Sequence, residues 1–384
     1  MKKSIFYGIT LNVILLGMAS LFTDLSSEIL IPLIPLFMSN LGAPVFFIGI
    51  LGGISDLIVS MVHFFSGYWS DLTGKRKRFV FIGYSISASM KLAMSLATSW
   101  IHIFILRPIE RIGKGLREPP RDAILAETTP KKVHGKIFGI HRAFDTAGAI
   151  MGSILAAFFL ALGLTYNKIF LIAAIISFIS LIPLFFVKEK KIVLKKGSLN
   201  IRLKNIPKNL KKFIFVSTIF ALANFSYMFF ILRAQQFFSS FFTVLLYIIF
   251  NISYWIFAIP AGMWADKIGK KRILILGYIL FTLVCLNFVF ANSFLSFYLG
   301  FIFYGISHAF IVGNQRALAA DLAKKRIGTG IGAFHMFISL AALPAGVIAG
   351  LLWNFISPEA TFIFGALVAL ISAIVFILIR LNEK

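Results

Sequence analysis

Two copies of one short pattern lie 195 residues apart in this chain of 384 residues. The copies occupy residues 67–76 and 262–271, and each has the form Gly-x-x-x-Asp-x-x-Gly followed by two basic residues. Each copy lies between two long apolar stretches. The chain is therefore predicted to be one helical module duplicated, with helices that span a membrane.

The composition supports this prediction. Hydrophobic residues make up 59% of the chain and charged residues 14%, with a mean hydropathy of +0.92, whereas a soluble domain has about 25% charged residues. The apolar run over residues 5–38 is too long for the core of a signal peptide and predicts a first transmembrane helix. The single cysteine, Cys285, allows no disulfide within the chain.

A membrane-spanning helix needs about 20 apolar residues. The predicted spans are residues 8–38, 45–69, 79–98, 101–125, 136–162, 168–187, 213–234, 241–264, 273–291, 294–318, 327–352 and 359–380. We expect an all-α membrane protein of 12 transmembrane helices in two pseudo-symmetric six-helix bundles. Their predicted limits are 1–187 and 213–384, joined by a basic linker at 188–212.

The net charge of +24 follows from this topology. Most of the 38 Lys and Arg residues fall in alternate connections, and the opposite connections carry only Lys168 and Arg233. Basic connections remain on the cytoplasmic side, so both termini and the linker are predicted to be cytoplasmic, in a multi-pass protein of the cell (inner) membrane. The charge therefore does not indicate nucleic acid as a partner.

The repeated pattern resembles the loop motif between helices two and three of the major facilitator superfamily. The matching positions, which in that family hold the inward gate closed, are Gly67, Asp71, Gly74, Lys75, Arg76, Gly262, Asp266, Gly269, Lys270 and Lys271. We expect Gly67 to let two helices approach and Asp71 to cap a neighbouring helix. Leu72 departs from the family, which usually has a basic residue there, whereas Lys267 keeps it.

Two further stretches partly resemble the family. Arg107 and Gly113 match a motif of its fourth helix, although Glu110 and Arg111 replace a glutamine and a glycine. The fifth helix keeps the Gly-x-x-x-Gly spacing of residues 148–152, which permits close helix packing, but a serine replaces the family's proline. The resemblance implies secondary transport by alternating access, and the last departure weakens an analogy with antiporters.

The fourth predicted helix is the most charged. At about 100° per residue its charged side chains fall in one sector of the helix, and they are Arg107, Glu110, Arg111, Lys114, Arg117, Glu118, Arg121 and Asp122. Lipid would penalise each of them by several kcal/mol, so this face is expected to point into a cavity or toward partners. Two consecutive prolines, Pro119 and Pro120, are expected to kink its end.

Possible partners for these charges lie on the other predicted helices of the first half. They are Asp24, Glu28, Asp56, His63, Lys91, His141, Arg142 and Asp145. The predicted membrane spans of this half contain seven acidic and seven basic residues, so their charges cancel. The second half has few such residues, chiefly Arg316 and Asp321.

Two interpretations of these charges remain open. Arg107 and Arg111 either bind the anionic part of a solute or belong to a salt-bridge network that holds the helices together. Asp24 or Glu28 either binds a coupling proton, because burial disfavours the charged form, or stays paired with these arginines. His141 is either a proton shuttle or a packing residue.

We expect a proton-coupled secondary active transporter for a small anionic or zwitterionic solute, acting as a monomer. The alternatives are an exporter of lipophilic drugs or siderophore-type compounds, a lipid flippase and a membrane receptor. Neither metal-ligand spacings nor a phosphate-binding loop occurs in the sequence. The sequence therefore predicts no enzyme, no cofactor and no metal.

Overall fold

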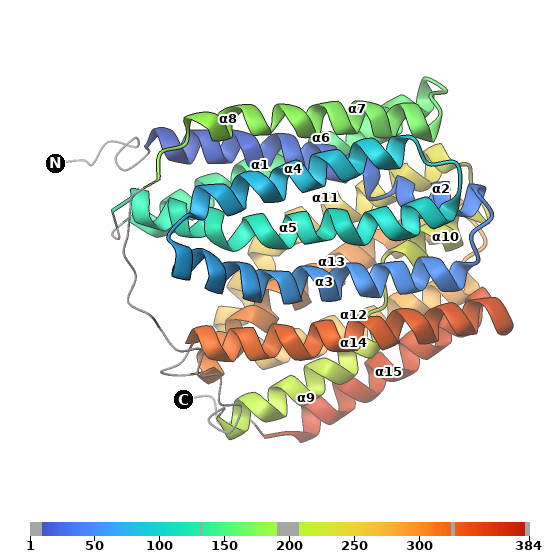
Figure 1. Ribbon diagram of the computed structural model, residues 1–384. Helices are drawn as coiled ribbons and strands as arrows, with labels where there is room; N and C mark the ends of the chain where they lie inside the picture. The colour runs from blue at the N-terminus through green and yellow to red at the C-terminus, as the bar shows by residue number, and fades with distance from the viewer. Residues whose placement is uncertain (1–9, 131–132, 190–206, 324–326, 381–384) are drawn as a thin grey trace. The chain divides into compact units, whose positions relative to one another are not determined.

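The computed structural model describes residues 10–130, 133–189, 207–323 and 327–380, which form α-helices joined by short connections (Figure 1). The chain divides into two compact units: unit 1 contains residues 1–41 and 58–198, and unit 2 contains residues 42–57 and 199–384. Residues 190–206, most of the predicted linker, lie outside the described part.

Helix α3 (Val45–Thr73) begins in unit 2 and ends in unit 1. The other helices of unit 1 are α1 (Leu11–Leu30), α2 (Leu33–Asn40), α4 (Arg76–Ser95), α5 (Trp100–Thr128), α6 (His134–Ala161), α7 (Tyr166–Ile179) and α8 (Leu181–Phe186). Those of unit 2 are α9 (Lys208–Ala223), α10 (Met228–Gln235), α11 (Ser240–Ile268), α12 (Lys270–Phe290), α13 (Phe294–Ala323), α14 (Ile327–Phe355) and α15 (Pro358–Leu378).

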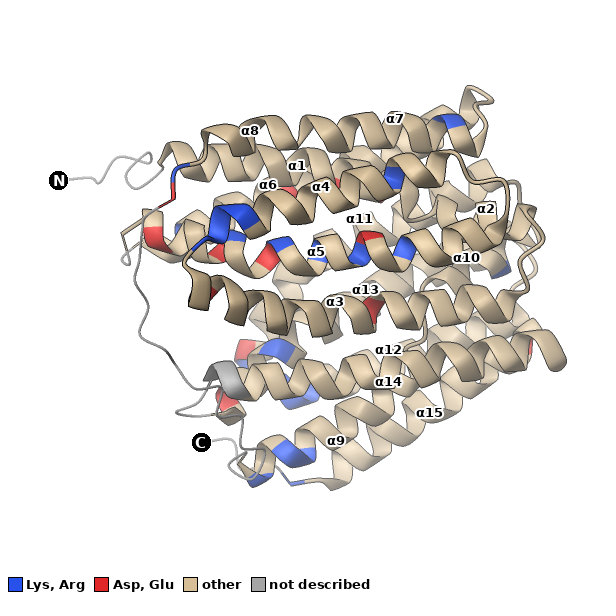
Figure 2. Cartoon of the chain, in the orientation of Figure 1, with Lys and Arg blue, Asp and Glu red and all other residues tan. Residues whose placement is uncertain are grey.

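All twelve predicted spans are helical within the described residues. Ten segments there are long and apolar enough to cross a membrane. The other two predicted spans, α4 and α5, are 20 and 29 residues long, but their charged side chains lower their hydropathy. Figure 2 shows these charges as blue and red bands along α5. Length alone therefore lets α4 and α5 span the hydrocarbon core.

Three predicted spans are interrupted, which the sequence analysis missed. The first is broken at residues 31–32, between α1 and α2, and the seventh at residues 224–227, between α9 and α10. These two breaks occupy equivalent positions in the duplicated halves. The sixth is broken at Ser180, three residues before Pro183. Proline removes a backbone donor and clashes with the preceding turn, which accounts for the breaks near Pro32 and Pro183.

Glycines allow two close helix crossings in unit 1. A Cβ on Gly148 of α6 would collide with the Leu21 carbonyl of α1, which confirms the close packing expected from the Gly-x-x-x-Gly spacing. A Cβ on Gly83 of α4 would lie 2.7 Å from the carbonyl oxygen of Gly113 on α5. Backbone contact at these crossings brings the polar side chains of α1, α4, α5 and α6 together.

The two units have different cores. Unit 1 packs aliphatic residues of α1, α4, α5 and α6 around Tyr84. Unit 2 is rich in aromatic contacts: Phe220 stacks on Tyr278 with ring centres 3.9 Å apart, and Phe230 stacks on Tyr304 at 4.2 Å. Stacked rings bury large areas and retain specific geometry, so these side chains form the interior of unit 2 rather than its lipid-facing surface.

A substitution pair on α6 tests the α1–α6 crossing. Gly148→Ala places a methyl group against the α1 backbone, whereas Gly139→Ala on the same helix meets nothing within 4 Å. We expect Gly148→Ala to lower the free energy of unfolding by about 1–3 kcal/mol through overpacking. The comparison is the apparent melting temperature of each purified variant in detergent, followed by circular dichroism. Equal melting temperatures for the two variants would contradict the close crossing.

Candidate functional site

The first copy of the repeated loop motif forms a network of ion pairs in unit 1. Gly74 has a φ of +62°, a backbone conformation that favours glycine. Asp71 pairs with the Arg76 guanidinium at 2.8 Å, and Arg76 also pairs with Glu127 at the end of α5. The backbone N–H of Arg76, at the start of α4, donates to Glu189. At the start of α4, therefore, Glu189 and not Asp71 accepts the backbone hydrogen bond.

The second copy in unit 2 keeps the backbone geometry but uses other partners. Gly269 has a φ of +99°. Lys270 pairs with Asp321 at 2.5 Å, and Lys271 donates to the carbonyls of Ile377 and Ile379. These contacts connect the motif to the ends of α13 and α15.

Two other expectations for the motif residues differ from the structure. A Cβ on Gly67 would meet only Pro119 at an ordinary 3.6 Å, and one on Gly262 would meet nothing within 4 Å. The prediction that Gly67 permits a close helix approach is therefore wrong for this structure. Lys75 occupies the N-cap position of α4, and Asp266 is exposed.

Glu110 lies at the centre of the charged face of α5. Its carboxylate accepts from Arg107 at 2.9 Å and lies 3.5 Å from Arg111. The Arg107 and Glu110 side chains are 1% and 0% exposed. Such burial is tolerated only because the charges neutralise one another. The two arginines expected to bind an anionic solute or a helix-one carboxylate therefore pair with their own helix.

About two turns further along α5, Glu118 contacts His63 and Lys114. Its oxygens lie 2.9 Å from the His63 Nε2 of α3 and 3.7 Å from the Lys114 Nζ. All three side chains belong to unit 1 and are partly exposed. This cluster attaches the second half of α3 to α5.

Serine hydroxyls serve as partners that the sequence analysis did not identify. Arg117 donates to Ser87 of α4 at 2.8 Å, and its guanidinium lies 4.7 Å from the centre of the Tyr84 ring. Lys91 is fully buried and donates to three hydroxyls at 2.9–3.4 Å, those of Ser26, Ser27 and Ser177. Serine patterns in membrane helices are too common to single out these positions from sequence.

A second cluster joins α1, α5 and α6. Arg121 donates to the Ser20 hydroxyl of α1 at 2.9 Å and pairs with Asp122 at 3.0 Å. On α6, Asp145 lies 3.5 Å from His141 and 3.8 Å from Arg142. The predicted candidates of helices one and five are thus brought close to the end of α5.

Asp24 lies on α1 within this cluster. Within the described residues it forms no hydrogen bond or ion pair. It interacts electrostatically with Asp145 and with three cations, Lys114, Arg117 and Arg121. Its expected pairing with Arg107 or Arg111 is therefore not observed. Glu28, one turn further, is half-buried, and its Cβ lies against Gly152 of α6.

Two predicted candidates are exposed. The Arg142 side chain is 72% exposed, and Arg316 is exposed on α13 of unit 2. Neither has the burial expected of a cation that binds a solute inside the protein.

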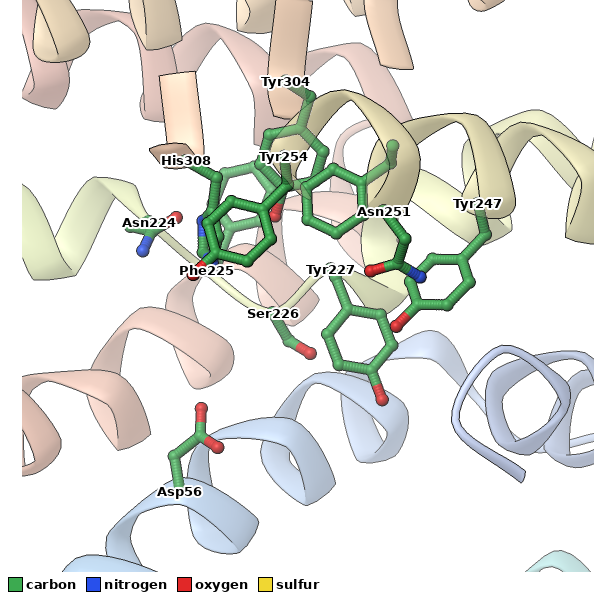
Figure 3. A pocket seen from close by; sticks show the side chains of 11 residues that line it. Asp56, Asn224, Phe225, Ser226, Tyr227, Tyr247, Asn251, Tyr254, Tyr304 and His308 are labelled. Carbon is green, nitrogen blue, oxygen red and sulfur yellow. The ribbon is translucent and has the colours of Figure 1, made fainter. Parts of the chain in front are cut away.

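Unit 2 contains a cavity of about 270 Å³ that the sequence did not reveal (Figure 3). Its residues come from the α9–α10 break, from α11 and α13, and from the first part of α3. They are Asp56, Asn224, Phe225, Ser226, Tyr227, Tyr247, Phe250, Asn251, Tyr254, Tyr304 and His308. All of them belong to unit 2. Interrupted helices that line cavities near the middle of the membrane are typical solute sites in transporters.

Rings form much of the cavity wall. Tyr304 stacks on Phe250 with ring centres 4.6 Å apart, and His308 contacts Tyr254 edge-on at 5.2 Å. In Figure 3 the Tyr227 hydroxyl and the Ser226 hydroxyl extend toward α3, which carries Asp56. The cavity thus combines aromatic faces, neutral hydrogen-bonding groups and one carboxylate.

Comparison with known proteins identifies the family. A model of the Major Facilitator Superfamily matches residues 16–253 and 213–384. The chain belongs to the major facilitator superfamily. A Methanocaldococcus jannaschii protein described as an uncharacterised MFS-type transporter is 45% identical over 383 residues, covering 96% of this chain and 94% of the relative. The protein is therefore a multi-pass membrane transporter of small molecules and not an enzyme.

Other similarities are more distant. A crystal structure of a variant of the nucleoside transporter NupG has a TM-score of 0.82 and 16% identity, covering 95% of this chain and 99% of that one. This similarity shows the fold alone, and it agrees with twelve helices in the superfamily arrangement. Multidrug resistance protein 2 of Bacillus subtilis is 33% identical over 132 residues, covering 34% of this chain and 33% of its own.

Glu110 provides a test of the buried network. Glu110→Gln keeps the side-chain size but leaves Arg107 buried without a counter-charge, so we expect a loss of about 3–5 kcal/mol in the free energy of unfolding. The control is Asp122→Asn on the same helix, which removes a carboxylate that is 47% exposed and should cost at most about 1 kcal/mol. Thermal unfolding of the purified variants measures both. A Glu110→Gln variant as stable as the control would show that the pair is not a structural element.

Proposed function

We propose that this transporter is a proton-coupled secondary active transporter that works by alternating access, with Asp24 as the principal proton-binding group. The observation that supports this proposal is the cluster in unit 1 in which Asp24 interacts electrostatically with Asp145 and with the cations Lys114, Arg117 and Arg121, the last of which also interacts with Asp145. Within the described residues Asp24 forms no hydrogen bond or ion pair, whereas Asp145 is paired with His141 and Arg142. Intramembrane ionisable groups in such positions typically belong to proton pathways.

This arrangement allows protonation of Asp24 to be coupled to a change in helix packing. A proton on Asp24 would remove one of the negative charges that attract the three cations. The cations would then be held by Asp145, by Glu118 and Asp122, and by the hydroxyls of Ser20 and Ser87. Because these groups lie on α1, α4, α5 and α6, a change of partners would alter how these helices pack. Ionic partner exchange of this kind converts a local charge change into a change between two packed states.

The sequence favoured a small anionic or zwitterionic solute, and the geometry gives this class limited support. An anion would need an available cation, but Arg107 and Arg111 are already paired with Glu110. The alternative of an exporter of lipophilic compounds has one specific point in its favour. Several relatives that match about a third of the chain are described as multidrug resistance proteins. A flippase or a receptor would move no soluble compound.

The remaining features of the proposal come from the sequence. We place the protein in the cell (inner) membrane with both termini on the cytoplasmic side, because basic residues concentrate in alternate connections. We also propose that it acts as a monomer, with residues 1–187 and 213–384 as the two moving halves and 188–212 as their linker. The motif loops would stabilise one of the two states.

Proton coupling can be tested in liposomes that contain the purified protein and a trapped pH-sensitive dye. A compound panel of cations, zwitterions, anions and lipophilic drugs is added one at a time across an imposed pH gradient. We expect at least one compound to cause a change in lumenal pH that protein-free liposomes do not show. In the Asp24→Asn variant this response should fall to the protein-free rate, because Asn cannot exchange a proton.

Asp321→Asn is the matched control, since it removes an exposed carboxylate of α13 outside the cluster. It should retain the response. Infrared difference spectra between pH 5 and pH 8 add a measurement that needs no solute, because a protonated carboxyl group has its own carbonyl band. Proton movement that persists in Asp24→Asn, together with an unchanged infrared band, would refute the assignment.

A further inference from the structure

The charge of the unit 2 cavity restricts what it can bind. Among the residues that the structure describes, its lining contains one carboxylate, that of Asp56, and neither lysine nor arginine. The Asp56 side chain is exposed to the cavity, and a single negative charge there attracts cations and repels anions. The other polar groups are hydroxyls, amides and the imidazole of His308, which are neutral hydrogen-bonding partners. The cavity therefore has the opposite charge preference to the basic residues of α5, from which the sequence predicted an anionic solute.

The aromatic lining supports the same selectivity. Tyr227 and Tyr247 lie with ring centres 5.8 Å apart, and Tyr254, His308 and Phe250 form a second group of rings in contact. Aromatic faces carry partial negative charge and attract organic cations, most strongly when water is excluded. Rings at several sides of one cavity together with a carboxylate are the arrangement that recognises substituted ammonium groups.

Asn251 adds a hydrogen-bonding requirement. Its Nδ2 is buried and has no hydrogen-bond partner within the described part of the chain. A buried donor without a partner is costly, so a solute that brings an acceptor to this atom would gain affinity. Asn251 and Asp56 are 195 residues apart, the offset of the duplication. The two halves thus place an amide and a carboxylate at equivalent positions of α11 and α3, and both line the same cavity.

We propose that this cavity is the binding site for a small organic cation that carries a substituted ammonium group and a hydrogen-bond acceptor. Asp56 and the tyrosine rings bind the ammonium group, and Asn251 donates to the acceptor. A volume of about 270 Å³ corresponds to about nine water molecules in the liquid, so the solute has roughly ten non-hydrogen atoms. This inference rests on the proposed transport function, for which it names the class of solute.

Binding to the purified full chain tests the proposal through a pair of compounds that differ in charge alone. Acetylcholine serves as the probe because it has an ammonium group and an ester acceptor on a frame of this size. Its uncharged carbon isostere, 3,3-dimethylbutyl acetate, has the same shape. Isothermal titration calorimetry should show acetylcholine binding at least about tenfold more tightly than the isostere, within the range of a desolvated cation–aromatic contact. Monomethyl glutarate, an anion of similar size, should not bind.

Three variants locate the site. Asp56→Asn should weaken acetylcholine binding at least about tenfold and leave binding of the isostere unchanged. Tyr254→Leu should weaken it more than Tyr254→Phe, because phenylalanine keeps the ring. This pair keeps the proposal testable if Asp56→Asn fails to fold. Asp321→Asn, outside the cavity, should bind like the unmodified protein.

The outcomes separate this inference from proton coupling. Asp24→Asn should lose proton movement yet keep the preference for acetylcholine over its uncharged isostere, because that preference depends on Asp56 and the rings of unit 2. Equal binding of acetylcholine and its isostere, or binding of the glutarate ester with comparable affinity, would overturn the cation site and leave proton coupling intact. Charge-selective binding combined with proton movement that does not depend on Asp24 would instead refute the coupling proposal alone.

Discussion

Unit 1 depends on the neutralisation of charges that lipid cannot solvate. Moving an unpaired ion into a medium of low dielectric constant costs several kcal/mol even after relaxation, and α5 alone carries eight charged residues between Arg107 and Asp122. This face must therefore point at other helices, and the neighbours that accept it are α1, α4 and the second half of α3. Glycines at the α4–α5 and α1–α6 crossings bring these helices close enough for side chains to meet.

The duplicated halves share a backbone plan but have diverged in chemistry. The first helix of each half is interrupted at an equivalent position, and both motif loops keep a glycine with positive φ. However, Gly113, at the α4–α5 crossing, corresponds to His308 of the unit 2 cavity. Ion pairs connect the polar side chains inside unit 1, whereas stacked rings fill much of the interior of unit 2. In our proposals this divergence separates proton coupling, in unit 1, from recognition of the solute, in unit 2.

The sequence predicted most of the fold because membrane helices are local features: hydropathy and length locate them, and the repeated motif reveals the duplication. It also predicted that one face of α5 is buried, since helical period fixes which side chains share a face. It did not predict that Glu110 would pair with both Arg107 and Arg111, or that Lys91 would donate hydrogen bonds to serine hydroxyls. Those outcomes depend on helix rotation and side-chain rotamers. The cavity was equally hidden, because its residues come from four separate segments and none is unusual by itself.

The arginines of α5 have two kinds of partner, carboxylates and serine hydroxyls. This difference indicates which helix contacts of unit 1 can exchange partners. Breaking a buried ion pair such as Arg107–Glu110 costs about 3–5 kcal/mol, whereas a hydrogen bond to a charged group contributes about 1.5–3 kcal/mol, and a hydroxyl can rotate to a new partner. Arg117 and Arg121 both donate to serines. The segment near Arg107 is therefore the rigid part of α5, and the segment that faces Asp24 is the part whose contacts exchange at lower cost. A proton-driven rearrangement requires this combination, because one fixed segment has to hold the helix while the other changes partners.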